Sequence, residues 1–119
     1  MKILGLKYVL EVRDMDRAAE FYVKCFDLEV KFQSADWSDL AFGQAGVGLH
    51  PGADPEGIRQ TGLSFTVDDL DAAAERVRTS GGQVYKEPYG NPGEGVRLAL
   101  FIDPEGNSFM ASQDVGGWS

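Results

Sequence analysis

The sequence predicts an α+β fold made of two tandem βαβββ modules that share a cleft. Residues 12–20, VRDMDRAAE, are answered by residues 67–75, VDDLDAAAE, at an offset of 55 residues (67 − 12). An alternating apolar run precedes each copy, and each copy opens an Ala-rich amphipathic segment, which is the pattern of a strand followed by a helix. A repeated strand–helix unit indicates two structural halves related by a pseudo-twofold axis.

The first module is expected to begin with a half-buried strand over residues 3–12. Its even positions are apolar, so Gly5, Lys7, Val9 and Glu11 share the opposite face. Asp14 is a good N-cap for a helix that runs to about Cys25. Three short strands should follow, at about residues 29–34, 38–43 and 47–50.

The second module repeats this plan after a linker at about residues 51–58, which is rich in Gly and Pro. A strand over 61–67 leads to a helix that is capped by Asp68 or Asp69 and ended by Gly81-Gly82. Further strands are expected at 83–87, 97–102 and 108–113, with a loop at 88–95 and a tight turn at 103–107. The interpretation is one domain over 1–119, with modules at about 1–52 and 59–113 and a tail at 114–119.

Composition excludes several classes of protein. With 43% hydrophobic and 25% charged residues, 119 residues can bury one core. The net charge of −8 and the lack of clustered Lys and Arg argue against nucleic-acid binding. We see no membrane span and no signal-peptide pattern, so a cytoplasmic location is expected. The single cysteine, Cys25, permits no internal disulfide and is interpreted as a small buried hydrophobe.

Several short motifs together resemble the vicinal oxygen chelate superfamily, the group of glyoxalases, bleomycin-resistance proteins and extradiol dioxygenases. These motifs are the Val-x-Asp before each helix, Glu20-Phe21-Tyr22, Phe42-Gly43 and the turn Asp103-Pro104-Glu105-Gly106-Asn107. The resemblance covers about residues 3–113. It implies a curled mixed sheet around a cleft, with helices on the outside, commonly completed in a homodimer. Both enzymes and simple binders use this fold, so the fold leaves function open.

The resemblance also implies four places for metal ligands, one on the first and one on the last strand of each module. The first-strand places fall on Lys7 and Gly62, and the last-strand places fall near His50, uncertain by one strand step, and Met110. Of these four residues only His50 is a usual ligand, whereas zinc or iron needs three or four converging donors. We therefore expect no metal and no other cofactor, unless Glu11 or a partner chain contributes.

Lys7, Glu11 and His50 are the candidate catalytic residues, and each has a second interpretation. An inward Lys7 could hold an anionic group or act as a base, but it could also simply pair with Glu11 on the same strand. His50 could serve as an acid or base near neutral pH, or it could be an exposed residue at a strand end. We favour the structural interpretation of both Lys7 and His50.

The presumed cleft is rich in aromatic and apolar side chains that could stack on a flat ligand. Ordinary core or interface packing is the alternative for each of these side chains. The candidate ligand-binding residues are Lys7, Glu11, Trp37, Phe42, His50, Ser64, Tyr85, Tyr89, Arg97, Phe101 and Met110.

The resemblance and the lost ligands favour a metal-free small-molecule binder that sequesters a drug or natural product in the cleft of a homodimer. The ligand would be a small organic molecule, cationic or aromatic, because the acidic balance suits a cation. The alternative is a glyoxalase-like lyase or isomerase, either metal-free with Lys7, Glu11 or His50, or metal-dependent. A regulatory or immunity partner protein without small-molecule chemistry is a third hypothesis.

Overall fold

A computed structural model describes residues 1–52, 57–91 and 93–116, and in them two helices and eight strands follow one another as βαβββ twice. Parts of the predicted linker (53–56), of the predicted loop (92) and of the predicted tail (117–119) lie outside the described residues. The elements are β1 (Leu6–Val12), α1 (Met15–Phe26), β2 (Glu29–Gln33), β3 (Ser38–Phe42), β4 (Ala45–Pro51), β5 (Arg59–Thr66), α2 (Leu70–Thr79), β6 (Gln83–Tyr89), β7 (Val96–Ile102) and β8 (Asn107–Asp114).

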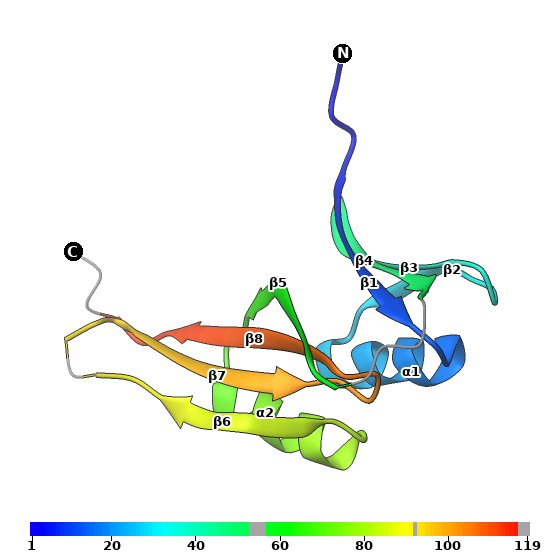
Figure 1. Cartoon of the computed structure of the whole chain (residues 1–119). Coiled ribbons are helices and arrows are strands. Elements are labelled where there is room, and N and C mark those ends of the chain that lie inside the picture. The colour runs from blue at the N-terminus through cyan, green and yellow to red at the C-terminus, as the bar shows by residue number, and fades with distance from the viewer. Residues whose placement is uncertain (53–56, 92, 117–119) are drawn as a thin grey trace.

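The strands form two four-stranded mixed sheets, one from each module (Figure 1). Sheet A has the order β1-β4-β3-β2 and sheet B has the order β5-β8-β7-β6. In each sheet the first strand runs parallel to the last strand of its module, and the other pairs are antiparallel. The two modules therefore share one topology, as the sequence repeat predicts.

The repeated Asp residues begin the two helices in the same way. The side chain of Asp14 accepts a hydrogen bond from the backbone N–H of Arg17 at 3.0 Å, and that of Asp69 accepts one from Ala72 at 3.0 Å. Each is an N-cap that satisfies one free donor of the first helical turn. Gly81, at a φ of +97°, turns the chain out of α2 in the left-handed region that glycine tolerates.

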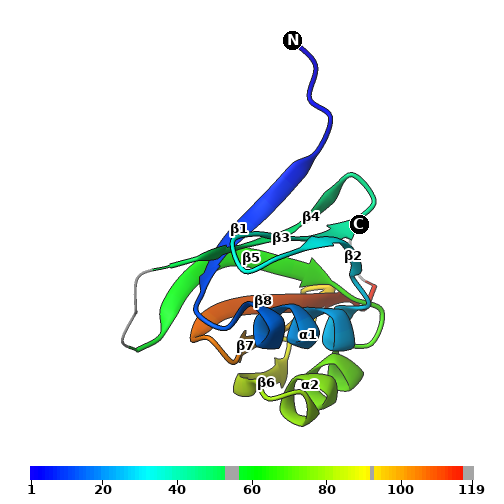
Figure 2. The same cartoon turned by 90° about the vertical axis from the view of Figure 1, so that its right-hand side faces the viewer.

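Helix α1 lies where the two modules meet and packs on both of them (Figure 2). It covers one face of sheet A, where Leu10, Leu40 and Leu49 are buried. Aromatic side chains of α1 also contact sheet B, since the rings of Phe26 and Phe65 stack at 4.1 Å between centroids. One continuous core thus includes residues of both modules.

The turn before β8 connects the second module to the first through hydrogen bonds. The Tyr22 hydroxyl in α1 donates to the Asp103 carboxylate at 2.6 Å, and that carboxylate also accepts the backbone N–H groups of Glu105 and Asn107. Burial, together with the nearby Asp103 charge, raises the pKa of Tyr22 well above its usual value, so its phenol remains a donor. The Asp-Pro-Glu-Gly-Asn motif therefore contributes an interface between modules as well as a turn.

Strand β1 is shorter than the predicted strand over 3–12, because it begins at Leu6. Residues before it project beyond the end of sheet A (Figure 1), and Ile3, Leu4 and Leu6 are largely exposed. The strand begins at Leu6 because its partner β4 begins at Ala45, which is paired with this residue. Within the described ranges, neither helix is long and apolar enough to cross a membrane.

Candidate functional site

Sheet A has an open face on the side away from α1, and three of the predicted site residues lie on it. Side chains alternate along a strand, so Lys7 and Glu11 point away from the buried Leu10. On β4, His50 is paired with Glu11 and belongs to the same face. Asp39 of β3 also points to this side, because it is paired with Gly48. No sequence pattern singles out Asp39 as a site residue.

Lys7 pairs with Asp39. The favoured prediction, a pair between Lys7 and Glu11, is wrong. The Lys7 ammonium lies 3.2 Å from the Asp39 carboxylate. Glu11 is four residues further along β1, or about 13 Å away at about 3.3 Å per residue. Gly46 and Gly48 of the intervening β4 have no side chains, so Lys7 can reach across that strand to β3.

The Lys7–Asp39 pair leaves an acceptor free. In the described part of the chain, Oδ1 of Asp39 is buried without a hydrogen-bond partner, although Oδ2 contacts Lys7. A buried acceptor of this kind costs free energy until a donor reaches it. A bound molecule with an N–H or O–H group would supply such a donor, so the open face of sheet A has one unsatisfied polar position.

Trp37 lies over the middle of this face. A Cβ atom added to Gly48 would fall 2.3 Å from the Cη2 atom of the Trp37 ring, so the indole rests directly on the glycine backbone. Ser34 fixes the loop that carries the indole, because its hydroxyl accepts the backbone N–H of Trp37 at 3.1 Å. The structure thus places Trp37 beside Asp39, on the face where Lys7 and His50 also lie.

Sheet B has an open face on the side away from α2, and it carries Ser64 and Met110, which are paired across β5 and β8. Met110 is in turn paired with Leu100 of β7. A hollow of about 410 Å³ lies on this face. Its lining comprises Ile58, Gln60, Thr61, Gly62, Leu63, Tyr85, Leu100, Ile102, Ser108, Phe109 and Met110.

Two predicted ligand-binding residues, Arg97 and Phe101, lie on the wrong side of sheet B. Arg97 donates hydrogen bonds from both terminal guanidinium nitrogens to the Asp71 carboxylate of α2, each at 3.2 Å. Phe101 is fully buried in the core, where its ring meets Phe109 at 5.5 Å. The pairing of Leu100 with Met110 shows why, because neighbours along β7 point to opposite faces.

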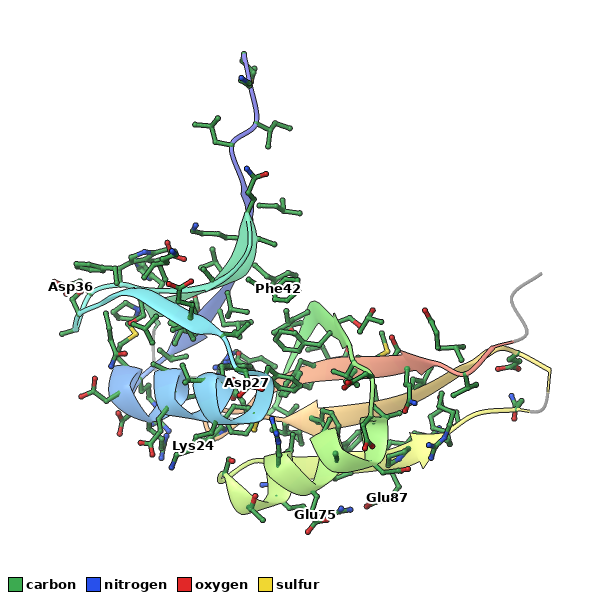
Figure 3. The ribbon with its side chains drawn as sticks, turned by 180° about the vertical axis from the view of Figure 1, so that it is seen from behind. Lys24, Asp27, Asp36, Phe42, Glu75 and Glu87 are labelled. Carbon is green, nitrogen blue, oxygen red and sulfur yellow. The ribbon has the colours of Figure 1, made fainter. Side chains whose placement is uncertain are left out.

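Phe42 and Tyr89 lie at the margins of the two sheets. Phe42 is 75% exposed, and Figure 3 shows it at the end of sheet A on the side of the β5 arch. It lines a second, mainly apolar hollow of about 580 Å³ together with Tyr8 and Phe26. Tyr89 ends β6, and the Lys86 ammonium lies 4.0 Å from its ring centroid, so its ring already has a cationic partner.

The two open faces point in different directions within one chain. Tyr8 points to the α1 side of sheet A, and its hydroxyl accepts the backbone N–H of Gly62 in β5. Lys7, the preceding residue, points to the opposite face of β1, although it also lines the hollow of about 580 Å³ together with Gly62 and Ser64 of β5. Sheet B likewise turns Phe65 and Phe109 toward α1. The candidate residues consequently divide into a polar set on sheet A and a largely apolar set on sheet B.

The strand pairing settles the metal-ligand position that the sequence left uncertain. The repeat offset of 55 carries Val9 to Ser64, and these residues are paired with Gly48 and Met110. The counterpart of Met110 is therefore Gly48, with His50 one inward step further. The four places carry Lys7, Gly48, Gly62 and Met110, which do not form a set of metal ligands.

Both glycine places are also closed to a ligand side chain. The Trp37 ring occupies the space above Gly48, and a Cβ atom on Gly62 would lie 2.9 Å from the Tyr8 hydroxyl oxygen. Among the described residues, no group of three or more His, Cys, Asp or Glu side chains could hold a metal ion. The residues present do not fit the metal centre that the resemblance implies.

Comparison with known proteins gives one family. The model of the glyoxalase-like domain matches residues 7–112 of this chain. A putative lactoylglutathione lyase from Brassica oleracea var. gemmifera is 29% identical over 123 residues, covering 91% of this chain and 43% of the relative. An anthracycline biosynthesis protein from Streptomyces peucetius is 42% identical over 60 residues, covering 50% of this chain and 22% of the relative. The chain spans less than half the length of these curated relatives.

Solved structures share the fold. A glyoxalase/bleomycin resistance protein/dioxygenase family enzyme from Burkholderia phytofirmans matches with a TM-score of 0.77 at 21% identity. The match covers 91% of this chain and 96% of that chain. A likeness over nearly the whole of both chains supports the assignment of two βαβββ modules.

Proposed function

The chain belongs to the glyoxalase-like domain family of the vicinal oxygen chelate superfamily, and from this premise we propose that it is a metal-free small-molecule binder. The proposal rests on the side chains at the four positions where the resemblance implies metal ligands. These positions hold an ammonium, two glycines and a thioether, and aromatic side chains close the space at both glycines. What remains on the two open faces is a surface suited to hold an organic molecule without a metal.

The proposed binding cleft is formed by two copies of the chain. The open face of sheet A and that of sheet B point in different directions in one chain, so a second copy must bring them together. The first strands of the modules, β1 and β5, are edge strands of their sheets. Large apolar side chains near them are exposed, including Leu6 at 76% and Phe42 at 75%. Exposed apolar surface of this kind is typical of an interaction site.

The proposed role is the sequestration of a drug or natural product. The partly exposed Trp37 on sheet A and the exposed Tyr85 on sheet B offer aromatic surface, and the free Oδ1 of Asp39 offers an acceptor. The Streptomyces peucetius relative is named for anthracycline biosynthesis, which is natural-product chemistry. Antibiotic resistance by sequestration belongs to the same proposal, as does a cytoplasmic location.

A glyoxalase-like lyase or isomerase is the second candidate. The Brassica oleracea relative is named a putative lactoylglutathione lyase. On the open face of sheet A, the carboxylate of Glu11 lies on the strand beside His50, and Lys7 lies on the same face. Side chains of these types can transfer protons without a metal. In this alternative, they would act on a substrate that is bound in the same cleft.

Ligand titration and metal analysis test the proposal together. We expect planar organic compounds to change the fluorescence of the purified protein, and a Trp37→Phe variant to lose that change. Trp118 lies outside the described residues and serves as the internal reference in this variant. Elemental analysis should find no stoichiometric zinc, nickel or iron. Stoichiometric metal together with turnover of lactoylglutathione would overturn the proposal in favour of the lyase.

A further inference from the structure

The hollow on the open face of sheet B contains no formal charge. Its floor and wall include Leu100, Ile102 and Met110, and Tyr85 lines it while remaining 68% exposed. The polar groups that line it come from neutral side chains such as Gln60 and Ser108. Charged residues make up 25% of the sequence, yet the described residues around this hollow include no Asp, Glu, Lys, Arg or His.

The open face of sheet A, unlike this hollow, carries charged side chains. The open face of sheet A carries Lys7, Asp39, Glu11 and His50. A charged group that enters the hollow on sheet B would lose hydration and find no counter-charge among its lining residues. An uncharged group would lose much less hydration and would gain contact with the apolar side chains.

The polar positions in the hollow suit neutral hydrogen-bonding groups. The Thr61 hydroxyl is already used, because it donates to the Ser108 carbonyl at 2.5 Å. The Gln60 amide and the Ser108 hydroxyl make no such bond to other described residues, so both can bind a hydroxyl or carbonyl group. The volume of about 410 Å³ is near the lower end of the range for ligand pockets.

We propose that this hollow takes the uncharged, ring-containing part of the ligand. The ring would lie on Leu100 and Met110 beside Tyr85, and its hydroxyl or carbonyl groups would reach Gln60 and Ser108. The inference rests on the proposed binding function and makes it more specific, because it selects neutral aromatic molecules over the cations that the acidic composition suggests. A small molecule is favoured over a protein surface, since the feature is a concavity and not a flat patch.

Three probes with the same naphthalene ring test this selectivity. They are 2-naphthalenemethanol, which is neutral, 2-naphthoate, an anion, and 2-naphthylmethylammonium, a cation. Calorimetric titration of the full chain at pH 7.4 should show the neutral probe binding at least about tenfold more tightly than either ion. Equal affinity for the three probes, or tighter binding of an ion, would overturn the inference while leaving the binding function intact.

Substitutions locate the binding to this hollow. Tyr85→Ala should weaken binding of the neutral probe, and Val115→Ala is the control because Val115 is exposed but lies outside the hollow. Met110→Glu should reverse the preference toward the ammonium probe, which a mere loss of folding would not do. Unchanged affinity in Tyr85→Ala would overturn the assignment. If neither these probes nor a wider planar panel binds, the proposed function itself fails.

Discussion

At the scale of single residues, Glu105 links the second module to the first by several hydrogen bonds. Its side chain is 1% exposed, and it accepts the backbone N–H groups of Arg13 at 2.5 Å and Asp14 at 2.6 Å. The Arg17 guanidinium also donates to it. Burial by itself would raise the pKa of Glu105, but the hydrogen bonds from Asp14, Arg17 and Arg13 outweigh it, and the pKa is lowered.

Replacing Glu105 with Gln should therefore destabilise the fold. Both backbone donors bind one carboxylate oxygen, Oε1, and the amide oxygen of Gln can replace it. The other oxygen, Oε2, accepts the Arg17 guanidinium, and in Gln an uncharged NH₂ donor would face that guanidinium instead. We expect the free energy of unfolding at pH 7 to fall by about 1–3 kcal/mol, measured by urea denaturation. Glu75→Gln, which alters an exposed pair with Arg78, is the control and should change it by about 0.5 kcal/mol or less.

The same carboxylate predicts a dependence on acid. The pKa of Glu105 is lower in the folded state than the unfolded value of about 4.3, so its stabilisation is fully present above that value. The stabilisation is lost as the pH falls through the lowered folded-state pKa. The difference in unfolding free energy between wild type and Glu105→Gln should hence shrink below about pH 4. A difference that stays constant from pH 7 to pH 3 would contradict this assignment.

Residue-level predictions succeeded where a local pattern was enough and failed where strand pairing decided. The alternation in β1 correctly placed Lys7 and Glu11 on one face, but the Lys7 partner depends on β3, two strands away. In β7 both alternating sets contain apolar side chains, so the sequence could not tell whether Phe101 or Leu100 faces the core. Pairing with β8 fixes that choice, and it is a long-range property.

At the scale of elements, the fold follows from signals that are read locally. Each helix has an Asp cap, an amphipathic body and a clear stop, so helix bounds were predicted to within about two residues. Strand ends were less accurate, as β1 shows, because the start of the partner strand β4, and not the alternation itself, determines where pairing begins. The sequence also left open whether Asp68 or Asp69 caps α2.

The structure resolves that choice in a way that mutation can check. Asp69 accepts the N–H of Ala72 and is the N-cap, whereas Asp68 is its exposed neighbour. Asp69→Ala should lower the free energy of unfolding by about 0.5–2 kcal/mol, and Asp68→Ala should have little effect. Denaturation midpoints of the two variants provide the measurement. Equal destabilisation by both variants would mean that the cap is shared or misplaced.

At the scale of the whole molecule, the two parts of the candidate site, the open face of sheet A and that of sheet B, point in different directions within one chain. Helix α1 lies against the inner faces of both sheets, and each open face points outward. The repeat predicted two matching modules, but it could not show that their open faces are kept apart in one chain. That arrangement depends on Tyr8 meeting Gly62 and on the aromatic contacts of α1, which join residues distant in sequence.

The proposed dimer can be tested at Phe42, which is 75% exposed and lies at the end of sheet A. If a second copy covers this surface, Phe42→Asp places a charge in the contact, which costs free energy unless it is paired. The side chain is too exposed for the change to unfold one chain. Sedimentation equilibrium should show a dimer for the wild type and a shift toward monomer for the variant. Thr79→Asp, on the exposed side of α2, is the matched control.

Binding measurements on the same variants connect assembly with function. If the cleft is formed by two copies, Phe42→Asp should weaken binding of planar ligands in parallel with its loss of dimer, although Phe42 does not line the hollow on sheet B. Raising the protein concentration should restore both, because association depends on mass action. A wild type that is monomeric and binds ligand would show that one open face suffices, and it would remove the second copy from the proposed mechanism.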